Sequence, residues 1–450
     1  MGKYFGTDGI RAVAGTFPLT SDFIEKLGWC ALDELKTYAQ AEGLKNQVII
    51  AQDSRASGPA ILQALQKGIR AAGVNVISVG VAPTPAVANI VRQTGSLCGV
   101  VISASHNPAE FNGIKFFTNH GTKLPEALEA KIEARIDACA ALPAPKAHYQ
   151  EDESLIDLYE NFLKSTVDAS LLKGTKVVLD CANGASYKIA AKVFHDLGMD
   201  LVVTGAKPDG TNINRGVGAL HTQFMQDLTA KEKAYAGFSF DGDADRVIAS
   251  DENGRQLDGD NIIASSALCL KQEGRLNGNK AVLTIMANLG CINYLKQNGI
   301  CVELTKVGDK YVSEALEKEN LSIGGETSGH IIFREFSNTG DGILSALQFL
   351  QCAKKSGKPL SWFGDQWKKY PSLLRAVAVS SKPALDTLEG FLPAVSELEK
   401  QMQGRGRIIV RYSGTEPKLR ILVEGEDEAL VSRIAQEVER LYLSKTEVHL

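Results

Sequence analysis

Val177-Val178-Leu179-Asp180 is a short apolar run that leads into the polar turn Ala182-Asn183-Gly184, and the same pattern occurs twice more along the chain. Val48-Ile49-Ile50-Ala51 leads into Asp53-Ser54-Arg55, and Val282-Leu283-Thr284-Ile285 is followed by a similar polar turn. Short runs rich in Val and Ile predict buried strands, and the longer helical patterns between them are typical of β-α-β units. We interpret the three runs as equivalent points of a threefold repeat, which predicts an α/β fold with mainly parallel or mixed sheets.

Breaks in these patterns predict where domains begin and end. The helical pattern is interrupted from Ala140 to Pro145, and a second change comes near Gly254, before Asp258-Gly259-Asp260 starts a new helix. After Tyr370-Pro371 the chain shows two strand patterns and a closing helical pattern, which are Arg407–Val410, Ile421–Glu424 and Asp427–Leu443. We therefore expect α/β domains at 1–150, 151–254 and 255–369, and a smaller α+β domain at 370–450.

Composition and charge exclude several classes of function. The 450 residues are 44% hydrophobic and 23% charged, with a formal net charge of -4, so no net basic field would concentrate nucleic acid or an anionic membrane. No run approaches the roughly 18–20 apolar residues that span a bilayer. The opening residues, Met1 to Gly6, match neither a signal peptide nor a myristoylation motif. We expect a cytoplasmic protein, a monomer or homodimer, without nucleic-acid or membrane partners.

The eight cysteines are scattered and form no C-x-x-C pair. Zinc sites and disulfide frameworks both need clustered cysteines. The cysteines are therefore interpreted as reduced residues of the core.

The most specific motif runs from Val100 to Glu110, where a buried strand ends in the polar sequence Ser103-Ala104-Ser105-His106-Asn107-Pro108. Asn107-Pro108-x-Glu110 matches an N-cap, a proline at the first helical position and a capping-box glutamate, so it predicts a helix. Ser105 would then lie near a helix N-terminus, where free N–H groups favour a phosphate or another anion. The alternative is that Ser105 and Asn107 only cap that helix.

A second motif places three carboxylates at alternate positions, Asp241, Asp243 and Asp245, after a strand. Such carboxylates can converge on one hard cation, and three ligands with an open face suit Mg²⁺. The alternative is an EF-hand calcium loop, since Glu252 stands at its position 12. Against that alternative, Arg246 occupies the position where the calcium loop requires glycine, and the flanks alternate like strands.

Two further loops carry polar side chains. Gly324-Gly325-Glu326-Thr327-Ser328-Gly329-His330 can hydrogen-bond sugar hydroxyls, or it is a plain turn with a solvated glutamate. The segment from Arg411 to Arg420 lies between the two late strands and combines two arginines with Ser413, Gly414 and Thr415. Exposed N–H groups, hydroxyls and guanidiniums can surround a phosphate. The alternative for this segment is a hairpin turn with solvated charges.

Taken together, the four motifs supply a nucleophile, a cation site, a loop that reads hydroxyls and a second anion site. Positioning and charge neutralisation dominate phosphoryl transfer, so these parts predict that chemistry. A hydrolytic phosphatase and a binding module without turnover are the alternatives.

The chain also resembles the α-D-phosphohexomutase superfamily, and most closely its phosphoglucosamine mutases. The motifs that carry the resemblance are Tyr4 to Arg11, Ser103 to Pro108, Asn112 to Phe117, Asp241 to Arg246, Gly325 to His330 and Arg411 to Pro417. The resemblance implies three α/β domains of like topology around a central cleft, with a fourth domain that closes over it. It also implies interconversion of glucosamine 6-phosphate and glucosamine 1-phosphate through a hexosamine 1,6-bisphosphate.

The same resemblance assigns roles to individual residues. It implies a phosphoserine at Ser105, and one Mg²⁺ per chain held by Asp241, Asp243, Asp245 and an oxygen at Ser105. The other roles that it implies are catalysis beside the serine for His106, proton transfer for Lys115 and His330, support of the reacting phosphoryl group for Arg11 and Arg246, sugar recognition for Glu326 and Ser328, and binding of the non-reacting phosphate for Arg411, Ser413, Gly414, Thr415 and Arg420. From the residues alone, Lys115 can also be a solvated charge at a strand edge, and Arg11 a structural ion pair.

The sequence departs from the family pattern at three places. Ala12 follows Arg11 where glycine is usual, and residues 216–221 differ from the common Gly-Cys-Gly-Ser-Thr-His. Thr327 stands where the glucosamine enzymes usually carry glutamine, within the loop expected to read the sugar. Phosphomannomutase and phosphoglucomutase relatives share the same machinery, so they are the alternative for the substrate.

Overall fold

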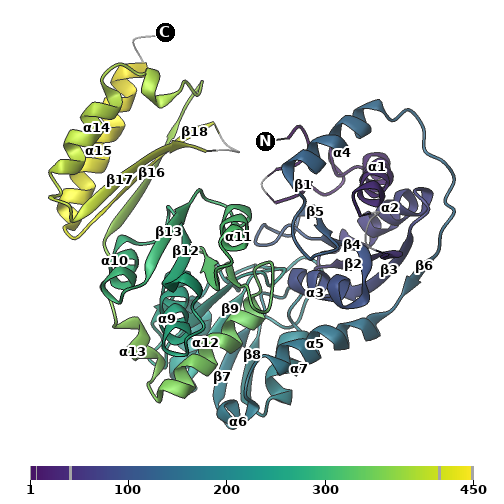
Figure 1. The fold of residues 1–450 in the computed structure, drawn as a ribbon, viewed down its shortest axis with the longest axis horizontal. Coiled ribbons are helices and arrows are strands. Elements are labelled where there is room, and N and C mark those ends of the chain that lie inside the picture. The colour runs from purple at the N-terminus through teal and green to yellow at the C-terminus, as the bar shows by residue number, and fades with distance from the viewer. Residues whose placement is uncertain (1, 7, 40–42, 414–416, 447–450) are drawn as a thin grey trace. The chain divides into compact units, whose positions relative to one another are not determined.

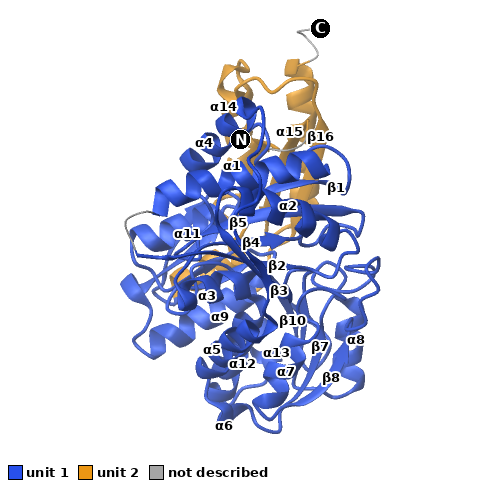
Figure 2. Ribbon diagram, turned by 90° about the vertical axis from the view of Figure 1, so that its right-hand side faces the viewer, with its two compact units in different colours: residues 1–286, 298–365 blue, residues 287–297, 366–450 orange. Residues whose placement is uncertain are grey.

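The computed structural model describes residues 2–6, 8–39, 43–413 and 417–446, which form the four β-sheets seen in Figure 1. The chain divides into two compact units, coloured separately in Figure 2. The first unit consists of residues 1–286 and 298–365, and the second of residues 287–297 and 366–450. Each unit is described by itself below.

The first sheet has six strands in the order β1-β5-β4-β2-β3-β6. Its strands are β1 (Ile10–Val13), β2 (Lys45–Gln52), β3 (Asn75–Val81), β4 (Ser96–Ile102), β5 (Phe111–Thr118) and β6 (Tyr149–Glu151). The accompanying helices are α1 (Ser21–Ala39), α2 (Gly58–Ala71), α3 (Thr84–Thr94) and α4 (Glu126–Ala138). Val48 and Ile50 of β2 share one buried cluster with apolar side chains of α1, α2 and α4. On the other face, Val87 and Val91 of α3 pack on β4, so both faces of this sheet are covered.

The second sheet has five strands in the order β11-β10-β9-β7-β8. These strands are β7 (Lys176–Asp180), β8 (Asp200–Thr204), β9 (Ala236–Phe240), β10 (Val247–Ser250) and β11 (Gln256–Leu257). The helices of this region are α5 (Ile156–Ser165), α6 (Ala169–Leu172), α7 (Ile189–Asp196) and α8 (Gln223–Lys231).

The third sheet has four strands in the order β13-β12-β14-β15. They are β12 (Lys280–Thr284), β13 (Cys301–Thr305), β14 (Ile323–Gly325) and β15 (Ile331–Phe333). The helices here are α9 (Gly259–Gln272), α11 (Asp309–Lys318), α12 (Gly342–Ser356) and α13 (Leu360–Gly364). The expected helix at Asp258-Gly259-Asp260 is confirmed, because Asp258 caps α9 in a capping box with Asn261.

The three sheets share one arrangement of four strands, which confirms the expected repeat. The shared orders are β5-β4-β2-β3, β10-β9-β7-β8 and β15-β14-β12-β13. In each case the last three strands are parallel, and the first strand runs antiparallel to its neighbour. The three apolar runs predicted as equivalent points are β2, β7 and β12, which occupy the same place in the three sheets.

The helix expected after Asn107 is not present, and that prediction was wrong. Residues 109–110 form a turn closed by a hydrogen bond from the Phe111 amide to the Pro108 carbonyl at 3.1 Å. β5 then starts at Phe111 and pairs antiparallel with β4. The aromatic and apolar residues of Phe111–Thr118 favour a strand, and only two residues separate Pro108 from it. Ser105 therefore lies in a strand-to-strand loop and not at a helix N-terminus.

The second unit contains a three-stranded sheet in the order β16-β18-β17, with antiparallel neighbours. Its elements are α10 (Leu289–Gln297), β16 (Ser372–Ala378), α14 (Phe391–Lys400), β17 (Gly406–Tyr412), β18 (Lys418–Gly425) and α15 (Glu428–Thr446). The two late strands and the closing helix agree with the sequence prediction. Ile434 and Val438 of α15 pack in the same buried cluster as Leu419 and Ile421 of β18.

The expected domain boundaries stay a prediction. β6 extends the first sheet to Glu151, and β11 adds residues 256–257 to the second sheet, so both sheets run slightly past the expected limits at 150 and 254. All eight cysteines are free thiols, and five of them are buried. In the part of the chain that the structure describes, no helix is both long and apolar enough to cross a membrane.

Candidate active site

Three of the predicted loops occupy the same position in the threefold repeat. The Ser105 loop joins β4 to β5, the aspartate loop joins β9 to β10, and Glu326 to His330 join β14 to β15. Each loop therefore follows a parallel strand and precedes the antiparallel strand of its own sheet. The fold thus explains why motifs so far apart in sequence meet in the first unit.

Ser105 is fully buried, and its hydroxyl donates a hydrogen bond of 2.6 Å to Asp241 Oδ2. The ring nitrogen Nδ1 of His106 lies 3.2 Å from the same hydroxyl. The backbone of Ser105 has a φ of 51°, in the left-handed region that non-glycine residues rarely adopt. The structure therefore places the serine hydroxyl at the aspartate loop, in a backbone conformation that its surroundings must maintain.

Asp241, Asp243 and Asp245 are buried, and each offers an oxygen within 4.8 Å of the others. Burial, together with the charges of Asp245 and Asp243, raises the pKa of Asp241 well above its usual range. The Oδ1 atoms of Asp243 and Asp245 have no hydrogen-bond partner among the described residues. Converging carboxylates with unused oxygens fit a hard divalent cation such as Mg²⁺.

The structure excludes the alternative of an EF-hand calcium loop. Strands β9 and β10 flank the aspartates where a calcium site of that kind requires helices. Glu252, which would be the last calcium ligand, instead accepts a hydrogen bond from the Ser361 amide at 3.1 Å.

Lys115 extends from β5 into the aspartate site and is 2% exposed, which excludes the alternative that it is a solvated charge. Its ammonium group lies 2.8 Å from Asp243 Oδ2, 2.8 Å from Asp8 Oδ2 and 3.6 Å from Asp245 Oδ2. Burial alone would lower the pKa of Lys115, but these carboxylates outweigh it and raise the pKa. Lys115 is therefore an ammonium ion at neutral pH in this arrangement.

Arg11 of strand β1 and Arg246 of the loop after β9 both approach the site. Arg11 forms an ion pair with Asp8, and its Nη1 donates to Asn107 Oδ1 at 3.2 Å. The backbone amide of Arg246 donates to Asp241 Oδ1 at 3.1 Å. The Nε atoms of both arginines are buried without a hydrogen-bond partner in the described ranges. Arg246 Nε also lies 3.7 Å from Asp245 Oδ1, beyond hydrogen-bond distance. Each of these buried N–H groups therefore has a hydrogen bond to give to an anion.

His330 lies on the third loop, and its backbone forms a β-bridge with Arg246. Its Nε2 atom lies 3.2 Å from Asp309 Oδ2, but neither ring nitrogen has a hydrogen-bond partner in the described part of the chain. Asp309 also pairs with Lys123, which pairs with Asp8. Charged side chains thus connect the third loop to the residues around Lys115.

The loop from Gly324 to His330, which is predicted to recognise a sugar, is held at two of its residues. Glu326 accepts a hydrogen bond from the Gly308 amide at 3.0 Å, and Thr327 Oγ1 donates to Asp260 Oδ1 at 2.9 Å. Ser328 is exposed, whereas Glu326 is half-buried. Thr327 therefore anchors its loop to the start of α9.

The predicted phosphate-binding segment belongs to the second unit. Arg411 of β17 is directly opposite Arg420 of β18, and burial together with Arg420 lowers the pKa of Arg411. Like charges directly opposite each other destabilise a sheet, unless an anion neutralises them. Ser413 is buried and its carbonyl accepts a hydrogen bond from Lys382 at 2.6 Å. Gly414 and Thr415 lie outside the described residues.

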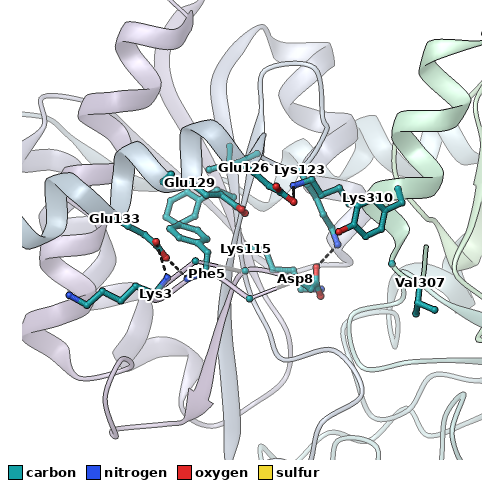
Figure 3. Close-up of a pocket in the computed structure, with 18 residues that line it drawn as sticks. Lys3, Phe5, Asp8, Lys115, Lys123, Glu126, Glu129, Glu133, Val307 and Lys310 are labelled. Carbon is teal, nitrogen blue, oxygen red and sulfur yellow. Dashed lines mark hydrogen bonds and ion pairs between the residues drawn. The ribbon is translucent and has the colours of Figure 1, made fainter. Parts of the chain in front are cut away.

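A cavity of about 460 Å³ opens beside Asp8, Lys115 and Lys123 in the first unit, and Figure 3 shows its lining. Glu129 of α4 and Lys310 of α11 line the same cavity. A space of this size suits a small polar ligand.

Sequence reasoning missed several residues that contact the predicted ones. Asp8 pairs with Lys115 and Arg11, and Thr84 Oγ1 donates to Asp243 Oδ2 at 2.6 Å. Asp8 lies in a quoted motif, which was the available signal, although its partners are remote in sequence. Thr84 starts α3 between two prolines, and its distance of 159 residues from Asp243 gave no signal at all.

The order and nature of the domains decide the family. The models of the phosphoglucomutase/phosphomannomutase family match α/β/α domain I at residues 2–141, domain II at 155–254, domain III at 258–370 and the C-terminal domain at 374–441. The chain belongs to the phosphoglucomutase/phosphomannomutase family. It is therefore an isomerase of the intramolecular phosphotransferase type.

Relatives in this family match the chain over nearly its full length. A phosphoglucosamine mutase of Methylobacillus flagellatus is 43% identical over 441 residues, which cover 97% of each chain. A phosphoglucosamine mutase of Caldicellulosiruptor saccharolyticus is 42% identical and covers 99% of this chain and 100% of its own.

Solved structures of the family share the fold at lower identity. A phosphoglucomutase/phosphomannomutase family protein from Burkholderia thailandensis has a TM-score of 0.79 and 22% identity, covering 99% of this chain and 98% of its own. The N-acetylphosphoglucosamine mutase of Aspergillus fumigatus, solved with GlcNAc-6P and magnesium, has a TM-score of 0.65 and 18% identity, covering 98% of this chain and 96% of its own. A variant of the Aspergillus enzyme was solved with glucose 1,6-bisphosphate.

Proposed function

We propose that this protein is a phosphoglucosamine mutase, which interconverts glucosamine 6-phosphate and glucosamine 1-phosphate through Ser105. The observation that carries the proposal is the 2.6 Å hydrogen bond between the Ser105 hydroxyl and Asp241, inside a buried group of three carboxylates. The relatives at 42–43% identity that carry this name support the substrate.

Asp241, Asp243 and Asp245 would hold one Mg²⁺, together with an oxygen at Ser105. When bound, the cation spreads the negative charge that develops on a phosphoryl group in transfer. Support comes from the two carboxylate oxygens that have no hydrogen-bond partner among the described residues, and from the magnesium reported for the Aspergillus mutase. Ser105 would be present as a phosphoserine in the active enzyme.

Arg11 and Arg246 would bind the phosphoryl group that is being transferred. Their free Nε–H groups are buried, so a phosphate oxygen would replace missing hydrogen bonds instead of competing with existing ones. The ion pair of Arg11 with Asp8 fixes the guanidinium without using its Nε.

Lys115, His106 and His330 would handle protons and orientation. Lys115 is an ammonium ion, so it can donate a proton to an oxygen in the site and, once neutral, accept one. Burial, with Arg246 and Arg11, lowers the pKa of His106 to about 4, so His106 is a neutral hydrogen-bond partner that orients the Ser105 hydroxyl. His330 has a ring nitrogen, Nδ1, without a hydrogen-bond partner among the described residues, and it could bind a substrate hydroxyl.

Recognition of the substrate would involve two further groups of residues. Glu326 and Ser328 would hydrogen-bond sugar hydroxyls, and the second unit would bind the phosphate that is not reacting through Arg411, Ser413, Gly414, Thr415 and Arg420. The opposed arginines of β17 and β18 support the second role, because an anion would relieve their repulsion.

Ser105 would pass its phosphoryl group to O1 of glucosamine 6-phosphate, which gives a hexosamine 1,6-bisphosphate. Serine would then take back the phosphoryl group from O6, leaving glucosamine 1-phosphate and restoring the enzyme. The glucose 1,6-bisphosphate found in the related structure supports an intermediate of this kind. We further propose four domains at the boundaries given above, a cytoplasmic location and a monomeric or homodimeric state.

The proposal is tested with purified enzyme, Mg²⁺ and a trace of sugar bisphosphate. The kcat/KM values for glucosamine 1-phosphate, glucose 1-phosphate and mannose 1-phosphate are compared, and the first is expected to be highest. A preference for mannose 1-phosphate or glucose 1-phosphate would assign the chain to the corresponding mutases. Stoichiometric release of inorganic phosphate would indicate a phosphatase, and absence of turnover with all three sugars would indicate a binding module.

A further inference from the structure

Arg55 is buried and directs all its N–H groups to acceptors around the Ser105 loop. Its Nε donates to Asp53 Oδ2 at 2.8 Å, which fixes the plane of the guanidinium. Nη2 donates to the carbonyls of Ser105 at 3.0 Å and Asn107 at 2.8 Å. Nη1 donates to the carbonyls of Pro108 and Phe111. A single guanidinium thus binds four carbonyl oxygens of the loop and leaves none of its own donors unused.

Asn214 reaches the same loop from the segment between β8 and α8. Its Nδ2 donates to the carbonyl of Ser105 at 2.9 Å and to that of Asn107 at 3.2 Å. Gly242 packs behind this contact, because a Cβ atom there would lie 2.4 Å from the Ser105 carbonyl oxygen. The loop is therefore held from two sheets.

These contacts bear on the backbone of Ser105, which has a φ of 51°. A serine in this region is strained and persists only where the surroundings determine its conformation. The carbonyl oxygen of Ser105 has two lone pairs, and Arg55 and Asn214 each donate to it. Rotation of this peptide would break both hydrogen bonds, so the two residues fix the direction of the serine side chain.

We propose that Arg55 and Asn214 are positioning residues, which hold the Ser105 backbone so that the hydroxyl points at Asp241. They act through the loop and do not touch the reacting atoms. The predicted effect on phosphoryl transfer rests on the proposed function. The predicted effect on the rigidity of the loop rests on the hydrogen bonds alone.

The test uses Arg55→Lys and Asn214→Asp. Lysine keeps the positive charge but cannot reach four carbonyls from one nitrogen. Aspartate keeps the shape of Asn214 but turns the donor into an acceptor that faces two carbonyl oxygens. Because small displacements of reacting groups cost about 10²-fold in rate, we expect kcat per phosphorylated molecule to fall by about that factor, while KM for the sugar phosphate stays within about twofold.

Arg70→Lys is the matched control. Arg70 lies in the last turn of α2, a helix that accompanies the first sheet. Its Nε also donates to a backbone carbonyl, that of Ala147 at 2.8 Å. This variant should keep kcat within about twofold of the unmodified protein. Equal losses in kcat for Arg70→Lys and Arg55→Lys would overturn the inference, and so would a full kcat per phosphorylated molecule in both test variants.

Hydrogen exchange separates this inference from the proposed function. Amides of residues 105–107 and 109–111 should exchange at least about tenfold faster in Arg55→Lys and Asn214→Asp than in Arg70→Lys, since exchange reports local opening. If the unmodified protein turns over no sugar phosphate, the proposed function fails, and the exchange rates still decide the inference. Unchanged exchange in both test variants contradicts it.

Discussion

Asp245 is a residue whose effect on stability should depend on whether a cation is bound. It is buried beside two other carboxylates, and one of its oxygens has no hydrogen-bond partner among the described residues. Like charges in a buried group repel each other. Without a cation, this repulsion opposes folding, although Lys115 offsets part of it at Asp243, and a bound cation would relieve it.

The Asp245→Asn substitution should consequently change stability in opposite directions with and without metal. In a chelator the variant is expected to melt at the same or a higher temperature than the unmodified protein, because one repelling charge is gone. Mg²⁺ should raise the melting temperature of the variant less than that of the unmodified protein. Loss of a residue that only supports a metal ligand lowers metal affinity about 10- to 100-fold, and loss of a ligand should lower the affinity for Mg²⁺ by more. Asp209→Asn, at an exposed residue, is the control. A full Mg²⁺ response in Asp245→Asn would exclude Asp245 as a ligand.

Lys115 offers a second prediction at this scale. Lys115→Met removes a buried ammonium group and leaves Asp243 without this partner, while Asp8 keeps Arg11 and Lys123. Breaking a buried pair in this way costs about 3–5 kcal/mol. Lys192→Met is matched, because Lys192 also lies 2.9 Å from two carboxylates but is 52% exposed, and such pairs contribute about 0–1 kcal/mol. Denaturant titrations in metal-free buffer measure both. Similar small losses in the two variants would mean that Lys115 is solvated in solution.

The sequence predicted Ser105 and the three aspartates because local motifs carry them. The roles of Asp8, Thr84 and Arg55 were not predicted, because their contacts depend on which strands become neighbours. Arg55 was recognised only as part of a polar turn after a strand. Its four carbonyl partners lie 50 to 56 residues away, so only the fold reveals them.

At the level of elements, the strand-to-strand loop is the unit that builds the site. The prediction of three equivalent strands was correct, since apolar runs followed by polar turns are strong local signals. The prediction of a helix after Asn107 was wrong, because a capping-box pattern was given more weight than the strand that starts at Phe111. The equivalent loops after β9 and β14 also lead into antiparallel strands, so the repeat itself could have corrected the error.

Helix α12 gives a prediction about pH. Asp341 caps this helix by accepting from the Leu344 amide at 2.9 Å, and it also accepts from the Tyr159 hydroxyl at 2.9 Å. Burial raises the pKa of Asp341 to about 7, whereas an unfolded aspartate titrates near 4. Between these two pH values the folded state binds a proton that the unfolded state does not. The contribution of Asp341 to the free energy of unfolding therefore falls as pH rises, by at most about 1.4 kcal/mol per pH unit.

Asp341→Asn should remove that dependence, because an amide keeps the shape and does not titrate in this range. The difference in denaturation midpoint between the unmodified protein and the variant is measured at intervals from pH 4.5 to 7.5. The unmodified protein should lose stability relative to the variant as pH rises. A difference that stays constant over this range would contradict the raised pKa.

At the scale of the whole molecule, the family match and the four sheets agree that a three-part α/β region precedes a smaller C-terminal part. The order of strands within the sheets was not predicted from the sequence, but β2, β7 and β12 were predictable, because each contains a short apolar run. The division into two compact units was not predictable. Residues 287–297 belong to the second unit, although in the sequence they lie between strands β12 and β13 of the third sheet.

The C-terminal unit should contribute binding and little chemistry. Arg411→Gln removes one of two opposed guanidiniums, and a hydrogen bond to a charged group contributes about 1.5–3 kcal/mol. We expect KM for the sugar phosphate to rise about tenfold or more with kcat nearly unchanged. Arg433→Gln, at an exposed residue of α15, should leave both constants unchanged. A large fall in kcat at constant KM would contradict this prediction and would indicate that Arg411 acts in the chemical step.

The most direct test of the account is the phosphorylation of Ser105 in the purified enzyme. After incubation with glucose 1,6-bisphosphate and Mg²⁺, the intact mass should rise by about 80 Da, with the phosphate mapped to the peptide that contains Ser105. Ser105→Ala should lose both this mass and the mutase activity, whereas Ser165→Ala should keep them. An active Ser105→Ala enzyme, or a phosphate mapped to another residue, would contradict the account.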